Sequence, residues 1–306
     1  MLPLLPRISF TSPHDLPSLA PSALHLPPPL PPISSVLYPE WTSAPDRLTL
    51  SAEEIHIWRV SLDSSPLKLQ ELAQTLASDE LQRAERFRFQ VDRRRFIVGR
   101  GTLRAILGRY LKTAPETIRF RYEASGKPAL LPASELPTAS PSHSSIAQTA
   151  NKPALEFNLS HSHELMVCAV SQSYQVGIDL EHVRSITDLE GLTQRFFSPQ
   201  EHLAIQRLPP GQRVRSFFQY WTCKEALLKA TGEGLADLSK IEVSIANQQA
   251  QLIQWTEKTD PTRQWWLHLF NPATDYIATL AVNFPRLTQQ KSPQLVFWNW
   301  QNEDQG

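Results

Sequence analysis

The order of strand and helix patterns along this chain occurs twice, and this repeat limits the folds that the chain can adopt. The first pass consists of a strand pattern, a long helical stretch and three strands, at residues 55–60, 78–111, 118–122, 154–160 and 165–170. The second pass has the same order, at residues 174–181, 199–231, 241–246, 264–270 and 276–282. Strands that follow one another without intervening helices favour antiparallel pairing. The sequence therefore predicts an α+β fold: a pseudo-twofold duplication of two similar α+β halves with antiparallel sheets.

Composition separates these two halves from weaker segments. Twelve of the 26 prolines fall within residues 1–48, which we expect to form a disordered arm. Residues 132–153 are rich in Ser, Thr, Ala and Pro and predict a low-complexity loop insertion. We expect the halves at 49–172 and 173–286, with a ligand site in the cleft between them. Residues 287–306 are expected to be a peripheral tail, although "LVFWNW" could add a late strand.

Charge, hydropathy and cysteine content exclude several classes of protein. The chain has 30 Lys+Arg and 30 Asp+Glu, which argues against a general binder of nucleic acids or membrane surfaces. No stretch approaches the ~18 apolar residues of a membrane helix, and prolines interrupt every apolar run at the start, unlike a signal peptide. Cys168 and Cys223 fit neither a disulfide framework nor a zinc site. We expect a cytoplasmic protein.

The stretch "VGIDLEHVR" (176–184) places two acids in a strand that otherwise looks buried. Asp179 and Glu181 are two residues apart, so in a strand they share one face, while Ile178 and Leu180 share the other. Two like charges that are held together and buried repel each other. Either the acids lie on a solvated edge strand, or a cation resolves the repulsion.

A third acid lies in the helical stretch "FFQYWTCKEALLKATGEGL" (217–235). Glu225 and Lys229 are four residues apart and share a helix face, an arrangement that on a solvated surface contributes about 0.2–0.5 kcal/mol. Together with Asp179 and Glu181, however, Glu225 gives three carboxylates. Such a set suits Mg²⁺, which prefers a few carboxylates, its own waters and phosphate oxygens.

A phosphate ligand needs positive or hydrogen-bonding partners, and several stretches offer them. Nine arginines crowd into residues 83–111, where most are expected on a solvated helix face but where an anion site is also plausible. Lys127 lies in a Gly-Lys-Pro turn, which by itself is ordinary surface. Ser160, His161 and Ser162 lie where one strand ends before the next begins.

Five motifs occur in order along the chain: "GKP" (126–128), "FNLSHS" (157–162), "VGIDLE" (176–181), "RFFSPQE" (195–201) and "WTCKEALLKATGEGL" (221–235). In these five motifs the chain resembles the surfactin-synthetase-type (Sfp-type) 4′-phosphopantetheinyl transferases. The resemblance covers about residues 55–282 and omits the proline-rich arm, the 132–153 insertion and the tail. The family's fold, two similar α+β halves with coenzyme A between them, agrees with the repeat read from the sequence.

The resemblance also implies roles for individual residues. Asp179, Glu181 and Glu225 would hold Mg²⁺, and Glu225, Lys229 and His161 would form the catalytic set. The residues that would contact coenzyme A are Arg83, Arg95, Lys127, Ser160, His161 and Lys229. A second basic contact would fall at Glu80, so the start of this helix departs from the family pattern.

The reaction that the resemblance implies is transfer of the phosphopantetheine arm of coenzyme A to a serine of an apo acyl or peptidyl carrier protein, with release of 3′,5′-ADP. Glu225 is the candidate base for the serine, and a metal-bound hydroxide is the alternative. We expect a monomer, because one chain supplies both halves. One alternative is a catalytically silent carrier-binding module. The other is another Mg²⁺-dependent phosphotransferase, and the lack of a Gly-rich P-loop argues against that second alternative.

Overall fold

The computed structural model describes residues 38–122, 126–131, 155–255, 260, 262–285 and 293–301, with the backbone alone at 235–237. Its α-helices are α1 (Pro66–Gln74), α2 (Ser78–Glu85), α3 (Gln90–Leu111), α4 (Leu189–Phe196), α5 (Pro199–Gln206) and α6 (Pro210–Thr231). Short 3-10 helices lie at η1 (Pro115–Thr117) and η4 (Leu235–Lys240). The strands are β1 (Thr42–Ser43), β2 (Glu54–Ser61), β3 (Phe120–Tyr122), β4 (Pro128–Leu130), β5 (Glu156–Ser162), β6 (Leu165–Ser171), β7 (Gln175–His182), β8 (Ile241–Ala246), β9 (Gln249–Trp255), β10 (Arg263–Phe270), β11 (Tyr276–Pro285) and β12 (Gln294–Trp300).

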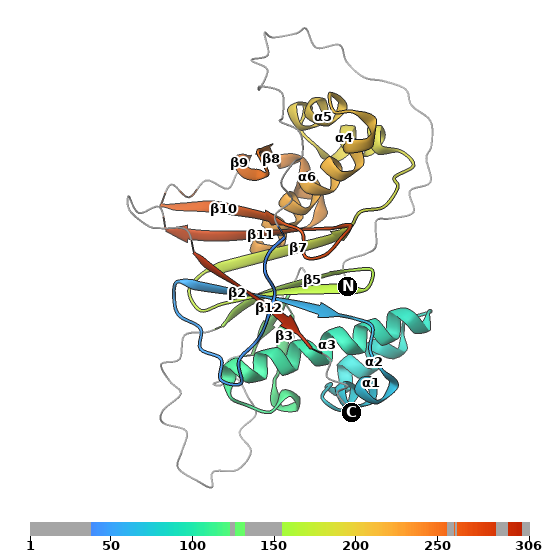
Figure 1. Ribbon diagram of the computed structural model, residues 1–306, viewed down its shortest axis with the longest axis vertical. Helices are drawn as coiled ribbons and strands as arrows, with labels where there is room; N and C mark the ends of the chain where they lie inside the picture. The colour runs from blue at the N-terminus through green and yellow to red at the C-terminus, as the bar shows by residue number, and fades with distance from the viewer. Residues whose placement is uncertain are drawn as a thin grey trace.

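Two sheets form the middle of the molecule, with α1–α3 outside one sheet and α4–α6 outside the other (Figure 1). One sheet has the strand order β1-β12-β2-β6-β5, and the other has the order β10-β11-β7. The pairs β3–β4 and β8–β9 form two small antiparallel sheets. Among the described strands, pairing is antiparallel except where β12 joins β1 and β2. The expected α+β class with antiparallel-rich sheets is confirmed.

Alternation along β7 divides its side chains between two environments. Val176, Ile178 and Leu180 are buried in the core between the two sheets. The intervening positions face the other way, toward α6, so that Asp179 and Glu181 share a face as their spacing predicts. The acids are therefore attached to the second sheet on the side that its long helix covers.

Two long helical stretches expected from the sequence are each broken once. The break between α5 and α6 has a local cause: Pro209 and Pro210 cannot continue the hydrogen bonds of a preceding helix. The break between α2 and α3 has no proline. There, Ala84 packs against Ile97 in a small buried cluster, and the chain must turn back on itself to bring them together.

The tail is not peripheral over the residues of β12. This strand lies between β1 and β2 and pairs with β2 along its whole length. The end of the expected arm is ordered as well, since β1 pairs with β12 and the Trp41 ring lies 5.2 Å from that of Phe297. Buried aromatic contacts explain why these segments join the sheet. Residues 1–37 and the expected insertion at 132–153 lie outside the described residues.

A buried ion pair fastens the long helix of the first half. Arg104 of α3 donates from Nε to Glu80 Oε2 of α2 at 2.8 Å, and both side chains are at most 2 % exposed. The Arg104 guanidinium also donates to the carbonyls of Pro115 and Ile118. Glu80, which departs from the family pattern, is therefore a structural partner of α3 in this chain.

The second half contains a matching pair. Lys224 of α6 lies 2.6 Å from Glu201 Oε2 of α5, and both side chains are at most 1 % exposed. Lys224 also donates to the carbonyls of Phe196 and Leu238, while Glu201 accepts from the amides of Ser198 and Val243. In each half, an acid at the start of a short helix binds a cation of the long helix.

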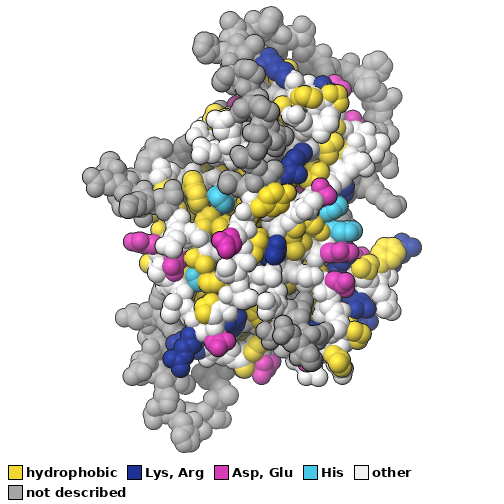
Figure 2. Space-filling view, in the orientation of Figure 1, with side chains coloured by type: hydrophobic (Ala, Val, Ile, Leu, Met, Phe, Trp, Pro, Cys, Tyr) yellow, Lys and Arg dark blue, Asp and Glu magenta, His cyan; other side chains and the backbone are white. Residues whose placement is uncertain are grey.

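The surface and the helices agree with the charge and hydropathy of the sequence. Charged side chains of both signs are interspersed on the face drawn in Figure 2, as expected from 30 bases and 30 acids. Within the described residues, none of the helices has the length and apolar content needed to span a membrane.

We predict that Arg104→Met destabilises the protein by about 3 kcal/mol, because buried Glu80 keeps only its longer, 3.5 Å ion pair with Arg100. Urea unfolding followed by circular dichroism measures the change. The matched control is Lys68→Met, which removes a cation from the exposed i,i+3 pair with Glu71 and should cost about 1 kcal/mol or less. Equal effects of the two substitutions would contradict the assignment of a buried anchor.

Candidate functional site

The close approach of α6 to β7 is set by a glycine. A Cβ atom on Gly177 would lie 2.0 Å from the Ala226 carbonyl oxygen and 2.5 Å from the Ala230 amide nitrogen, both in α6. Only a residue without a side chain fits, so the backbones of strand and helix touch here. This contact brings the acids of β7 within reach of the side chains of the helix.

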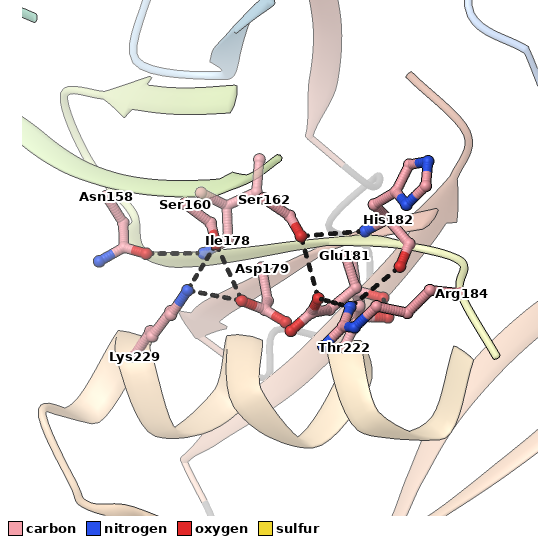
Figure 3. Close-up of polar contacts among 11 residues, drawn as sticks. Asn158, Ser160, Ser162, Ile178, Asp179, Glu181, His182, Arg184, Thr222 and Lys229 are labelled. Atoms are coloured by element: carbon pink, nitrogen blue, oxygen red, sulfur yellow. Dashed lines mark hydrogen bonds and ion pairs between the residues drawn. The ribbon is translucent and has the colours of Figure 1, made fainter. Parts of the chain in front are cut away.

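Asp179 is the centre of a buried polar cluster (Figure 3). Its Oδ1 accepts from Ser160 Oγ at 2.9 Å and from Lys229 Nζ at 2.5 Å. Lys229 Nζ also donates to Ser160 Oγ at 2.7 Å. Three separate elements, β5, β7 and α6, thus place one hydroxyl, one carboxylate and one ammonium together.

Glu181 has its own pair of partners. Its Oε2 accepts from Ser162 Oγ and from the Arg184 guanidinium, each at 3.0 Å. Burial first, and then the neighbouring charge of Asp179, raises the pKa of Glu181 above its ordinary value, against the effect of Arg184.

Glu225 of α6 completes the set of three acids, but in contrast to the other two it has no cation paired with it among the described residues. It is 6 % exposed. Burial raises its pKa to about 8, and the charge of Asp179 adds to this effect while Lys229 opposes it. The three carboxylates therefore lie close enough for the charge of one to raise the pKa of another.

A test of the expected metal site gives two observations. Within the described part of the chain, no three His, Cys, Asp or Glu side chains are already grouped as a metal centre. However, Asp179 Oδ2 and Glu225 Oε1 are both buried and accept no hydrogen bond from a described residue. Buried carboxylate oxygens without donors are costly unless a cation or proton joins them. The donor set, oxygen only, fits a hard cation such as Mg²⁺.

The remaining expected contacts lie around this cluster at different distances from it. His161 follows Ser160 at the end of β5 with an exposed ring. Lys127 donates to the Ala230 carbonyl at 3.2 Å, which places it beside the end of α6. Arg95 pairs with Glu164 at 3.4 Å, and Arg83 lies 5.5 Å over the Phe96 ring. The structure brings Ser160, Asp179 and Lys229 into direct contact, whereas Arg95 and Arg83 are paired elsewhere.

His161 combines an exposed ring with surroundings that resist its protonation. Partial desolvation lowers its pKa to about 4, and the positive charges of Lys229 and Arg95 act in the same direction. The ring is neutral at pH 7.

Sequence reasoning assigned no role in the site to two residues of the cluster, Ser162 and Arg184. Ser162 lies two residues after Ser160 and therefore on the same face of β5. Arg184 lies three residues after Glu181, beyond the end of the strand. The first could have been found from its spacing, whereas the second depends on how the chain turns after β7.

Comparison with known proteins gives the family. A model of the 4′-phosphopantetheinyl transferase superfamily matches residues 175–281, and a model of the N-terminal region of 4′-phosphopantetheinyl transferases matches residues 61–173. The chain is 44% identical over 242 residues to 4′-phosphopantetheinyl transferase HetI of Nostoc sp., a match that covers 79% of this chain and 93% of that protein. The chain belongs to the 4′-phosphopantetheinyl transferase superfamily.

Other transferases of this superfamily are more distant. The chain is 29% identical over 217 residues to psf-1 of Bacillus pumilus, covering 67% of this chain and 84% of that protein. It is 27% identical over 161 residues to Sfp of Bacillus subtilis, covering 53% of this chain and 62% of that protein. The resemblance drawn from five sequence motifs is confirmed.

We predict that Gly177→Ala destabilises the protein by about 1–3 kcal/mol, because the new Cβ forces α6 away from β7. Thermal unfolding measures the loss. Gly211→Ala is the matched control: it lies in the first turn of α6, its Cβ would meet no atom within 4 Å, and it should be neutral or stabilising by up to about 1 kcal/mol. Two substitutions of equal effect would show that the strand–helix contact is not tight.

We also predict that His161 titrates near pH 4 in the free protein instead of at its ordinary 6.5. NMR of the ring protons follows the titration, and the spectrum of His161→Gln assigns the signal. Lys229→Met should raise this pKa more than Arg95→Gln, since Lys229 has the larger effect. Because the unfolded chain takes up this proton at higher pH than the folded chain, His161 lowers folding stability as the pH falls from about 6.5 to about 4. A midpoint near 6.5 in the wild type would contradict the prediction.

Proposed function

We propose that this chain transfers the 4′-phosphopantetheine arm of coenzyme A to a serine hydroxyl of apo acyl or peptidyl carrier proteins, with Mg²⁺ as cofactor and 3′,5′-ADP as the second product. The proposal rests on family membership and on one structural observation. Ser160, Asp179 and Lys229, which come from three separate sequence motifs, are in mutual contact on β5, β7 and α6. Glu225, which lies on α6 with Lys229, is close enough to Asp179 for that charge to raise its pKa.

Asp179, Glu181 and Glu225 are the residues that would hold Mg²⁺. Asp179 Oδ2 and Glu225 Oε1 support this assignment, because both are buried without a donor. When bound, a divalent cation would neutralise the diphosphate of coenzyme A and stabilise the charge that develops on the leaving 3′,5′-ADP. In the free protein, Lys229 partly neutralises the charge of Asp179, and Arg184 partly neutralises that of Glu181.

The cations around the cluster would bind and orient coenzyme A. Lys229 is close enough to Asp179 to contact phosphate oxygens held at the acids, and its ammonium has three protons to share. His161 would donate to phosphate from the end of β5. Lys127, beside the end of α6, and Arg95, through an exchange of Glu164 for an anion, would bind the 3′-phosphoadenosine end. Arg83, whose guanidinium lies 5.5 Å over the Phe96 ring, is the remaining proposed contact.

The carrier serine must lose a proton as it attacks the phosphorus of the diphosphate. We propose the Glu225 carboxylate as the acceptor, directly or through a water: one of its oxygens would bind the cation and the other would take the proton. All of these groups belong to one chain, with β5 from the first half and β7 and α6 from the second. This supports the expectation that a monomer is sufficient.

The decisive test is intact-mass spectrometry of an apo carrier protein after incubation with this protein, coenzyme A and Mg²⁺. We expect a gain of one phosphopantetheine on the carrier serine, and EDTA should abolish it because the acids then lack their cation. No gain on fatty-acid, polyketide and peptide carriers, by a folded protein that still binds coenzyme A, would favour a silent carrier-binding module instead.

Glu225→Gln should reduce the rate of carrier modification by about 10²–10⁴-fold, since it removes both a proton acceptor and a carboxylate ligand. Single-turnover assays with saturating coenzyme A measure this rate. Glu190→Gln, at an exposed position in the first turn of α4, is the matched control and should leave the rate unchanged. A Glu225→Gln protein with full activity would contradict the assignment of this residue.

A further inference from the structure

The two acids of β7 are held in the same way by two different sets of residues. Asp179 Oδ1 accepts from a serine of β5 and from an ammonium group, Ser160 and Lys229. Glu181 Oε2 accepts from the next serine on that face and from a guanidinium group, Ser162 and Arg184. In each case, one carboxylate oxygen receives a hydroxyl and a cation.

The pattern follows from how β5 lies against β7 (Figure 3). No backbone ladder joins these two strands in the described structure; instead, side chains of β5 accept from backbone amides of β7. Asn158 Oδ1 accepts from the Ile178 amide at 2.9 Å, and Ser162 Oγ accepts from the His182 amide at 3.1 Å. The offset is 20 residues at both points, so the strands run in step and each acid meets one serine.

The direction of the Ser162 hydrogen bonds is fixed. Because its oxygen accepts from the His182 amide, its single proton is directed to Glu181 Oε2. Arg184 is fixed as well, since its NH1 also donates to the His182 carbonyl at 3.1 Å and its guanidinium lies 5.2 Å over the Phe218 ring. Both donors are therefore held by the backbone at the end of β7 and are aimed at one oxygen of Glu181.

We propose that Ser162 and Arg184 are positioning residues of the transferase site, which fix Glu181 through Oε2 and leave its other oxygen available to the cation. They are the counterparts of Ser160 and Lys229 at Asp179. This inference rests on the proposed function, since it concerns a carboxylate that would bind Mg²⁺. Partners that orient metal ligands in this way change metal affinity by about 10- to 100-fold when removed.

The test measures Mn²⁺ binding to the full chain by electron paramagnetic resonance, with and without coenzyme A. Mn²⁺ is a suitable probe because it prefers the same oxygen ligands as Mg²⁺. Ser162→Ala and Arg184→Gln should each weaken Mn²⁺ binding by about 10- to 100-fold. Ser162→Thr, which keeps the hydroxyl, should restore most of the affinity lost in Ser162→Ala.

The matched controls remove a hydroxyl and a guanidinium at exposed positions, Ser173→Ala and Arg207→Gln, and should leave Mn²⁺ affinity unchanged. Thermal unfolding of each variant reports any loss of the fold, and Arg184→Gln tests the inference independently if Ser162→Ala does not fold. The steady-state KM for the carrier should change little in Arg184→Gln, whereas the Mg²⁺ concentration for half-maximal rate should rise.

The outcomes separate this inference from the proposed function. Mn²⁺ binding by the wild type that neither substitution weakens overturns the inference alone. Weakened binding in both variants, together with no modification of any carrier, supports the inference and overturns the proposed reaction. A wild type that binds no Mn²⁺ overturns the inference and the metal part of the proposed function together.

Discussion

The contact between α6 and β7 is the constraint on which the rest of the site depends. Gly177 lets the helix backbone touch the strand, and the alternation of β7 then turns Asp179 and Glu181 into the narrow space beside that contact. A wider gap would separate Lys229 from Asp179, and two partly buried carboxylates would be left to repel each other. The position of the long helix is itself fixed by the buried pair of Lys224 and Glu201, whose partners come from four different segments. The local chemistry is therefore a consequence of how tightly one helix is anchored.

The two halves share an anchoring scheme but differ in what they hold. Arg104 and Glu80 in the first half correspond to Lys224 and Glu201 in the second, about 120 residues later in each case. In the first half, however, the sheet presents aromatic side chains to α3. The Trp58 indole nitrogen of β2 donates to the Tyr110 hydroxyl of α3 at 2.8 Å, beside a buried hydrophobic cluster. The duplicated frame thus carries carboxylates on one side and a packed aromatic core on the other.

Much of this arrangement could be predicted from the sequence, for identifiable reasons. The shared face of Asp179 and Glu181 follows from the two-residue period of a strand, and that of Glu225 and Lys229 follows from the helical period. The partner of Glu80 could not be predicted, because its hydrogen bonds depend on a turn between α2 and α3 that no proline marks. Arg184 was missed for a similar reason, since it lies beyond the strand and reaches Glu181 only through the path of the following loop. Spacing within one element is readable from sequence, whereas contacts between elements require the fold.

The place of β12 has a consequence for how the chain reaches its folded state. This strand forms from residues 294–300 but pairs with β2, at residues 54–61, so the first sheet contains a contact between segments about 240 residues apart. During synthesis, β2 emerges long before its partner, and one edge of the first sheet stays open until residues 294–300 have left the ribosome. The first half therefore cannot complete its folding before the second half exists. Removal of β12 would consequently disrupt the sheet of the amino-terminal half before it affects the nearer, carboxyl-terminal half.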